Sequence, residues 1–257
     1  MRWFSLLRVN LQKEYIELVR YLPNTIATVF TFYIIFLGMF LGIQVVGDPS
    51  TQELNTQYVI VNNLFWFLTM STINKVGWQV TNESMRGTLE QLSMSPMGIW
   101  RIMTARLIAS TVINFIILIV LLYLSMFTTG QWLNIDLLSI LPILLITLVS
   151  MYGLGFIIAG ISMVLKQVDA FLQILQFILA GLAFVPVTVA PIISYFPFVK
   201  GLDLVRSVMI HGVTLSQISV TDYGILIGNA IIYFVLGIAF FMFCERIAMK
   251  RGLLAHY

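Results

Sequence analysis

Long apolar runs without a single charged residue dominate the pattern of this chain. Six such runs occur, and they cover residues 21–47, 54–74, 107–135, 137–165, 170–199 and 223–244. Each run is longer than the roughly 20 apolar residues that a helix needs to cross a bilayer. The pattern therefore predicts an all-α integral membrane protein with six transmembrane helices, at about 24–46, 58–78, 102–129, 137–165, 170–189 and 223–244.

The segment before the first run is different, because apolar residues recur there at helical spacing among polar ones. The apolar positions are Phe4, Leu7, Leu11, Tyr15 and Leu18. Such an amphipathic pattern is typical of a helix that lies in the headgroup plane of a membrane. Residues 1–22 are therefore predicted to form an interfacial elbow helix, which ends where Pro23 starts the first span.

The connection before the last run, residues 190–222, is apolar but interrupted by Pro191 and Pro197. Residues 199–210 have the spacing of an amphipathic helix, with three apolar residues on one face and three charged residues at i, i+3 and i+6. The apolar set is Leu202, Val205 and Met209, and the charged set is Lys200, Asp203 and Arg206. We expect short helices that re-enter the membrane or lie at its outer surface, although an ordinary structured loop explains the pattern as well.

Composition agrees with a membrane location, since 60% of the residues are hydrophobic, 10% are charged and the mean hydropathy is +0.97. Soluble domains carry roughly 25% charged residues. With both ends on one side, that side holds all Lys and Arg residues except Lys200 and Arg206. Basic residues mark cytoplasmic loops, so both termini are predicted to be cytoplasmic in the cell membrane. The net charge of +3 follows from this bias and indicates no nucleic-acid partner.

A polar island at residues 81–100 lies between the second and third runs, on the predicted cytoplasmic side. Gly87 interrupts a helical continuation of the second span, and Thr88 with Gln91 three residues later has the spacing of a capping box. Pro96 disfavours helical geometry at Ser95. The island thus predicts a helix of about two turns, too short to be stable without burying its leucines against something.

Within the island, Gly-Thr-Leu-Glu at 87–90, with Glu83 before it and Ser95-Pro96 after it, resembles the first cytoplasmic loop of ABC exporter permeases with the type-2 membrane domain. The layout of elbow helix, spans and outer segment is also similar to that family, known as type V ABC exporters. The resemblance implies one permease domain over residues 1–257 and a coupling helix that docks into a separate ATPase subunit. It assigns this coupling role to Glu83, Arg86, Gly87, Thr88, Leu89, Glu90, Leu92 and Pro96, with Leu89 and Leu92 as apolar anchors.

The family further implies a second permease copy or a related permease beside this chain. ATP and magnesium would bind the partner ATPase, and this chain would hold no cofactor and catalyse no reaction. Its own sequence agrees, because it contains no phosphate-binding loop of the form G-x-x-x-x-G-K-[ST]. The predicted spans also contain no acidic residue of the kind that ion-coupled carriers keep at depth. Lys75 lies near a cytoplasmic end and is expected to snorkel.

Neutral polar residues within the spans are candidates for a substrate route, although such residues more often serve interhelical packing. They are Thr28, Thr31, Asn62, Asn63, Gln173 and Gln176. The pairs Gly38/Gly42 and Gly224/Gly228 have the spacing of close helix packing, and Pro186 is expected to kink the fifth span. His211 and His256 stand alone and indicate no metal site.

An apolar route favours export of a hydrophobic or amphipathic compound such as a drug, an antibiotic or a lipid. Export of polysaccharide or teichoic acid is the alternative within the family, but only Arg20-Tyr21 of the Arg-Asp…Arg-Tyr pattern of those members is present. A membrane scaffold or immunity subunit without transport, and a membrane enzyme, remain alternatives of other classes.

Overall fold

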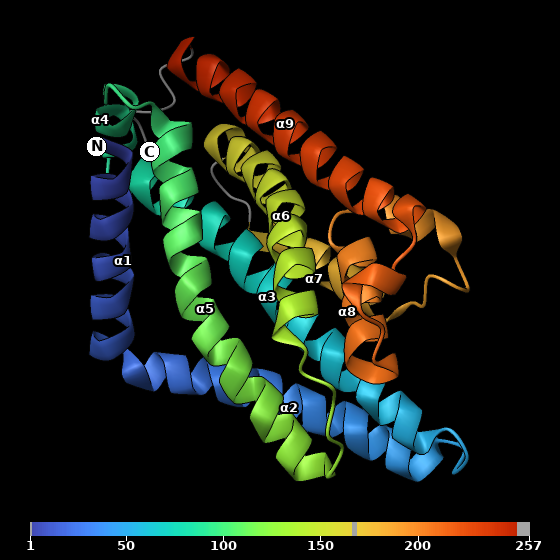
Figure 1. Ribbon diagram of the computed structural model, residues 1–257. Coiled ribbons are helices and arrows are strands. Elements are labelled where there is room, and N and C mark those ends of the chain that lie inside the picture. The colour runs from blue at the N-terminus through green and yellow to red at the C-terminus, as the bar shows by residue number, and fades with distance from the viewer. Residues whose placement is uncertain (1, 166–168, 251–257) are drawn as a thin grey trace.

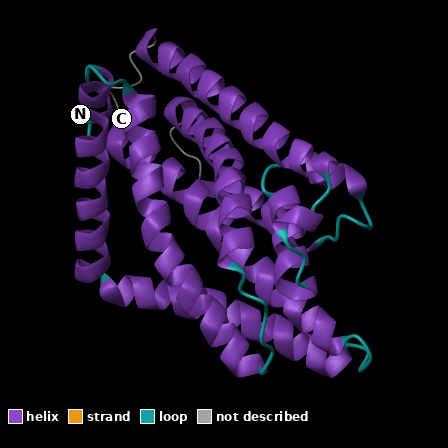
Figure 2. Ribbon diagram, viewed as in Figure 1, coloured by secondary structure: helices purple, strands orange, loops and turns teal. Residues whose placement is uncertain are grey.

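The computed structural model describes residues 2–165 and 169–250, and the regular structure in these ranges is helical (Figures 1 and 2). The first helices are α1 (Arg2–Arg20), α2 (Leu22–Val46), α3 (Gln52–Met85) and α4 (Leu89–Ser93). They are followed by α5 (Ile99–Thr129), α6 (Leu137–Leu165), α7 (Asp169–Phe184), α8 (Val199–His211) and α9 (Val220–Lys250). Two 3₁₀ turns flank α8, namely η1 (Pro191–Tyr195) and η2 (Leu215–Gln217).

Four of the described helices, α2, α5, α6 and α9, are long and apolar enough to cross a membrane by length and composition. The all-helical, membrane-type fold is therefore confirmed. The other two predicted spans differ from these four. α3 has 34 residues but carries Asn62, Asn63 and several Thr side chains along its middle, and α7 is an apolar helix of only 16 residues. The assignment of α3 and α7 as the remaining two of six spans thus stays a prediction.

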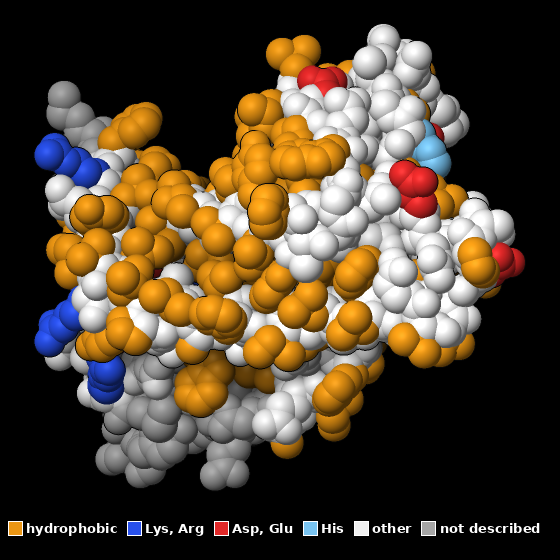
Figure 3. Space-filling view, turned by 90° about the horizontal axis from the view of Figure 1, so that it is seen from below, with side chains coloured by type: hydrophobic (Ala, Val, Ile, Leu, Met, Phe, Trp, Pro, Cys, Tyr) orange, Lys and Arg blue, Asp and Glu red, His pale blue; other side chains and the backbone are white. Residues whose placement is uncertain are grey.

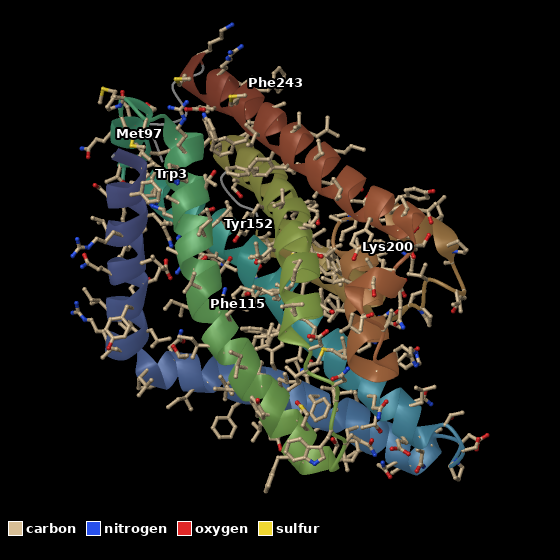
Figure 4. The ribbon with its side chains drawn as sticks, viewed as in Figure 1. Trp3, Met97, Phe115, Tyr152, Lys200 and Phe243 are labelled. Carbon is tan, nitrogen blue, oxygen red and sulfur yellow. The ribbon has the colours of Figure 1, made fainter. Side chains whose placement is uncertain are left out.

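Helix α6 lies at the centre of the bundle, where it contacts α9, α3 and α8, while α5 packs on α3 and α1. The approach of α6 to α9 depends on two glycines: a Cβ on Gly153 or on Gly237 would overlap the backbone of the other helix. Tyr152 of α6 donates a hydrogen bond to Thr111 Oγ1 of α5 over 2.8 Å (Figure 4). The core is therefore a tight cluster built around α6.

The two ends of the bundle differ. The start of α1, helix α4 and the end of α9 lie at one end, whereas the connections at 47–51 and 130–136 lie at the opposite end (Figure 1). Seen from below, Lys and Arg side chains gather at the left edge, while Asp, Glu and His lie toward the centre and right (Figure 3). A broad hydrophobic surface separates them, as expected for a bundle whose middle faces lipid.

Several local predictions need correction. Helix α7 ends at Phe184, so Pro186 follows the helix and does not kink it. Gly38, Gly42, Gly224 and Gly228 have open space around a Cβ, so these spacings make no close contact within the chain. The predicted turn at 166–169 and the basic tail from 251 fall largely outside the described residues.

Helix α1 covers Arg2–Arg20 of the predicted elbow segment 1–22, and its buried face includes polar residues that the pattern did not indicate. Its buried polar residues, Asn10 and Glu14, face the chain, and α1 packs mainly on α5. Phe4 and Tyr15 of the predicted apolar face are 76% and 61% exposed. Leu7, Leu11 and Leu18 of the predicted face are half-buried beside Asn10 and Glu14. The buried face therefore combines part of the predicted apolar face with the acidic residue, because Glu14 finds a cationic partner there, as described below.

The segment 190–222 is also more deeply placed than its pattern indicates. In α8 the apolar set Leu202, Val205 and Met209 is buried as predicted, but Lys200 and Arg206 are buried too. α8 contacts α6 and α3, and a Cβ on Gly201 would overlap Thr147 of α6. Helix α8 is therefore packed into the bundle together with its charges, while its place in the membrane or at its outer surface stays a prediction.

Candidate functional site

The loop between α3 and α5 is bounded by two glycines in the left-handed region. Gly87 has φ of 68° and Gly98 has φ of 73°, values that residues with a Cβ rarely adopt. Gly87 ends the continuation of α3, which reaches Met85, and Gly98 precedes the start of α5. The chain between them forms α4, which has five residues and is about half a turn shorter than the two turns predicted.

A charged pair fixes the base of this loop. Glu83 Oε1 lies 2.8 Å from Arg106 Nη1, which joins the end of α3 to α5. Thr88 donates hydrogen bonds to the carbonyl oxygen and the carboxylate of Glu83. Thr88 is in helical geometry and its side chain caps no backbone N–H of α4, so the predicted capping box is wrong. The hydroxyl is instead used to hold the Glu83 carboxylate.

These contacts also set the charge of Glu83, which lies beyond the predicted span 58–78. Partial burial by itself would raise the pKa of the carboxyl group, but the hydrogen bonds from Thr88 and Arg106 and the positive charge of Arg106 outweigh it. The pKa of Glu83 is therefore lowered from its ordinary value. The Glu83 carboxylate is therefore charged near neutral pH. We call its contacts with Thr88 and Arg106 the Glu83 brace.

Helix α4 turns one leucine inward and its polar side chains outward. Leu89 is 1% exposed and belongs to the core, whereas Leu92 is only partly buried. Leu89 therefore packs within the chain and is not the free anchor that the sequence predicted. The loop surface consists of exposed residues, namely Arg86, Gly87, Glu90, Gln91, Met94 and Pro96. Met94 is the prominent apolar one, at 72% exposure.

A first cavity of about 470 Å³, the inner cavity, lies where α1 and α2 meet α3 and α5. Its walls mix polar and apolar side chains, including Thr28, Asn74, Asn114 and Phe67. Lys75 Nζ lies 2.8 Å from Glu14 Oε2 and 3.6 Å from Glu17 Oε2 in its wall. Lys75 is thus ion-paired to two residues of α1.

A second cavity of about 440 Å³, the outer cavity, lies at the end opposite α4, between the end of α2, the first half of α3, the segment 184–188 and α8. Asn62 and Arg206 line it together with Asn55 and Tyr58. Sequence analysis did not single out Arg206 as a site residue. Its spacing was informative, because Arg206 follows Leu202 by four residues and precedes Met209 by three, which places all three on one helix face.

The predicted substrate-route residues do not come together in one cavity. Thr28 lines the inner cavity and Asn62 the outer one, while Asn63 donates to the Phe32 carbonyl oxygen between α3 and α2. Of the others, Thr31 and Gln173 are exposed and Gln176 is half-buried. The structure thus has two separate cavities at opposite ends of the bundle, and the predicted residues do not line one continuous polar path.

The model of the family described as "ABC-2 family transporter protein" matches residues 40–239. The chain belongs to the ABC-2 transporter family. Among curated proteins, no match to this chain was found. Membership makes the chain a multi-pass membrane permease of an ABC transporter, and permeases of this family are normally non-catalytic subunits that work with an ABC ATPase. Among the described residues of the permease, no group of His, Cys, Asp and Glu is arranged to hold a metal ion.

Proposed function

We propose that this permease is the membrane-spanning subunit of an ATP-driven exporter in the cell membrane. Its six spans would be α2, α3, α5, α6, α7 and α9, with α1 as the elbow helix and both termini in the cytoplasm. A separate ABC ATPase, with ATP and magnesium, would dock on the loop 86–98. Two permeases, identical or related, would stand side by side above two ATPases.

The observation that carries the proposal is the construction of the loop 86–98. The Glu83–Arg106 pair and the buried Leu89 connect α4 to the ends of two long helices. Because of these contacts, a displacement of α4 would move the ends of α3 and α5 with it, which a flexible loop would not do. Its outer surface offers Glu90, Gln91 and the exposed Met94, a mixture of charge and apolar surface that suits a docked protein.

The lining of the inner cavity favours an amphipathic substrate. It opens between the elbow helix and three of the proposed spans, and its walls combine hydroxyl, amide and ionic groups with Phe67 and Ile117. A compound with a polar head and an apolar body would find partners for both parts there. We therefore infer that the exported compound is a hydrophobic or amphipathic molecule.

The test replaces the exposed side chains of α4 and leaves its buried brace intact. We expect the double variant Glu90→Ala with Met94→Ala to reach the membrane at normal levels, because neither side chain is buried. Copurification of an ABC ATPase encoded beside this chain should fall about ten-fold, the effect of losing about 1.4 kcal/mol of binding free energy. ATP-dependent export, measured as uptake into inside-out vesicles, should fall with it.

The matched control, Glu53→Ala with Met242→Ala, removes the same side chains from α3 and α9 and should retain the ATPase. Full ATPase binding and export by the α4 variant would contradict the coupling role. ATPase binding without any ATP-dependent uptake of amphipathic compounds in the wild type would instead favour a non-transporting subunit.

A further inference from the structure

The outer cavity contains a buried positive charge that the proposed coupling and export roles do not use. Arg206 is 4% exposed, yet its side chain lines the cavity. Its Nε donates to Asn62 Oδ1 over 2.6 Å, and one terminal nitrogen donates to the carbonyl oxygen of Ala183. The guanidinium also lies over the ring of Tyr58, 5.8 Å from the centroid.

Among the described residues, no carboxylate forms an ion pair with Arg206. The nearby acidic residues are held by another base: Lys200 Nζ lies 3.3 Å from Asp203 Oδ2 and 2.7 Å from Asp222 Oδ1. Lys200 is labelled on α8 in Figure 4. Lys200 thus has two carboxylate partners, whereas the hydrogen-bond partners of Arg206 are neutral and Asp203 acts on its charge without a direct contact.

A buried charge without a counterion is costly, because desolvation is offset only when the charge is paired and fully hydrogen-bonded. A guanidinium has five N–H donors, and the contacts above use two of them. The planar group is suited to phosphate and carboxylate oxygens, which accept two parallel hydrogen bonds from it. The cavity beside Arg206 therefore has the chemistry of an anion site.

The remaining walls define what else the ligand contains. Asn55, Tyr58 and Thr188 add polar groups, while Ile43, Val59 and Phe184 are apolar. A free inorganic ion would leave this apolar wall unused, and an uncharged hydrocarbon would leave the guanidinium unpaired. The walls favour a molecule that has both an anionic head and an apolar part.

We propose that the outer cavity binds the anionic oxygen group of an amphipathic molecule, a phosphate or a carboxylate, through Arg206. The apolar part of the molecule lies against Ile43, Val59 and Phe184. Either a bilayer lipid or the exported compound supplies such a head, and the recognition chemistry is the same. Binding at Arg206 does not depend on ATPase coupling or export. A negative result for this site would therefore leave the proposed export function unaffected, and the reverse also holds.

The probes are dihexanoylphosphatidylglycerol, the uncharged dihexanoylglycerol, which lacks the phosphate, and inorganic phosphate. They are titrated into the full chain in a neutral detergent, with tryptophan fluorescence and thermal unfolding as readouts. We expect saturable binding of the glycerol lipid that is about ten-fold tighter than that of the uncharged diglyceride, the effect of one charge-assisted contact. Inorganic phosphate that displaces the lipid identifies the head as sufficient, and failure to displace it identifies the whole amphipath as the ligand.

Arg206→Gln should weaken binding of the glycerol lipid about ten-fold or more. The matched control Arg101→Gln makes the same substitution at an exposed position of α5 and should leave the affinity within about two-fold, because Arg101 does not line the cavity. If Arg206→Gln does not accumulate, Val59→Phe narrows the cavity without touching the partners of Arg206 and should also abolish binding. Absence of lipid binding, or wild-type affinity in Arg206→Gln or Val59→Phe, would overturn the proposal and leave Arg206 as a tie between α8, α3 and the end of α7.

Discussion

At the scale of single residues, partners far apart in the sequence decide what a charge does. Lys75 is ion-paired with Glu14, 61 residues away, and Arg206 reaches Asn62, 144 residues away. A pattern of apolar runs places such residues near membrane edges and gives no indication of these partners. The same holds for Glu83, whose charge is set by Thr88 and Arg106.

The Glu83 brace makes a prediction about stability and pH. Glu83→Gln should lower the free energy of unfolding by about 1 kcal/mol near pH 7, between the values for exposed pairs and for hydrogen bonds to charged groups. Thermal unfolding should then shift by roughly 2–4 °C. Hydrogen exchange of residues 86–98 should become faster.

The sign of the pH dependence follows from the lowered pKa of Glu83. The contribution of the carboxylate is fully present above the ordinary glutamate pKa of about 4.3, and it is lost as the pH falls through the lower pKa of the folded state. The difference between wild type and Glu83→Gln should therefore vanish at acid pH. Glu90→Gln, at an exposed position of α4, is the control and should match wild type; a pH-independent difference would contradict the charged brace.

At the scale of helices, the glycines that matter for packing are not those with the familiar spacing. Gly153 and Gly237 let α6 and α9 touch backbone to backbone, whereas Gly224 and Gly228 on α9 face open space. Close approach depends on which face of a helix meets a neighbour, and spacing along one helix does not report that. The open glycine faces are available for contacts outside the chain.

Helix α9 therefore offers a matched pair of substitutions. Gly237→Ala places a Cβ against the backbone of Gly153, where no side chain can move aside, and should cost about 1–3 kcal/mol of stability, the usual cost of overpacking. Gly228→Ala adds the same methyl group where nothing lies within 4 Å, and should be neutral. Thermal unfolding in detergent measures both, and equal effects of the two substitutions would show that α6 and α9 are not in backbone contact.

At the scale of the whole molecule, the two ends of the bundle carry different chemistry. The start of α1, helix α4 and the end of α9 share one end (Figure 1), and this is the end with most of the Lys and Arg residues. We propose, from the positive-inside rule, that this end faces the cytoplasm. The inner cavity with its ion-paired lysine and the outer cavity with its unpaired arginine then face opposite membrane surfaces.

Cysteine labelling tests this orientation. In a Cys244→Ala background, Ser50→Cys lies in the connection between α2 and α3 and should react with a membrane-impermeant maleimide in intact cells. Met94→Cys, at a position that is 72% exposed, should react only after permeabilisation. Labelling of Met94→Cys from outside would reverse the topology and remove the ATPase from α4.

The sequence alone was enough to predict the helical membrane fold, a helix at 2–20, the break at Gly87 and the apolar face of α8. These features depend on local properties: the length of apolar runs, the periodicity of a helix and the backbone freedom of glycine. For the same reason the resemblance at 83–96 could identify the family, which the match over residues 40–239 shows independently.

Only the tertiary structure decided that Asn10 and Glu14 of α1 are buried, that Leu89 packs inward, and that Arg206 lines a cavity. Each of these depends on contacts between residues distant in the sequence, and in a chain rich in apolar residues hydrophobicity alone does not distinguish a lipid-facing side chain from a buried one. The charges were the least predictable residues, because the free energy of a charge depends on its partner more than on its neighbours in the sequence.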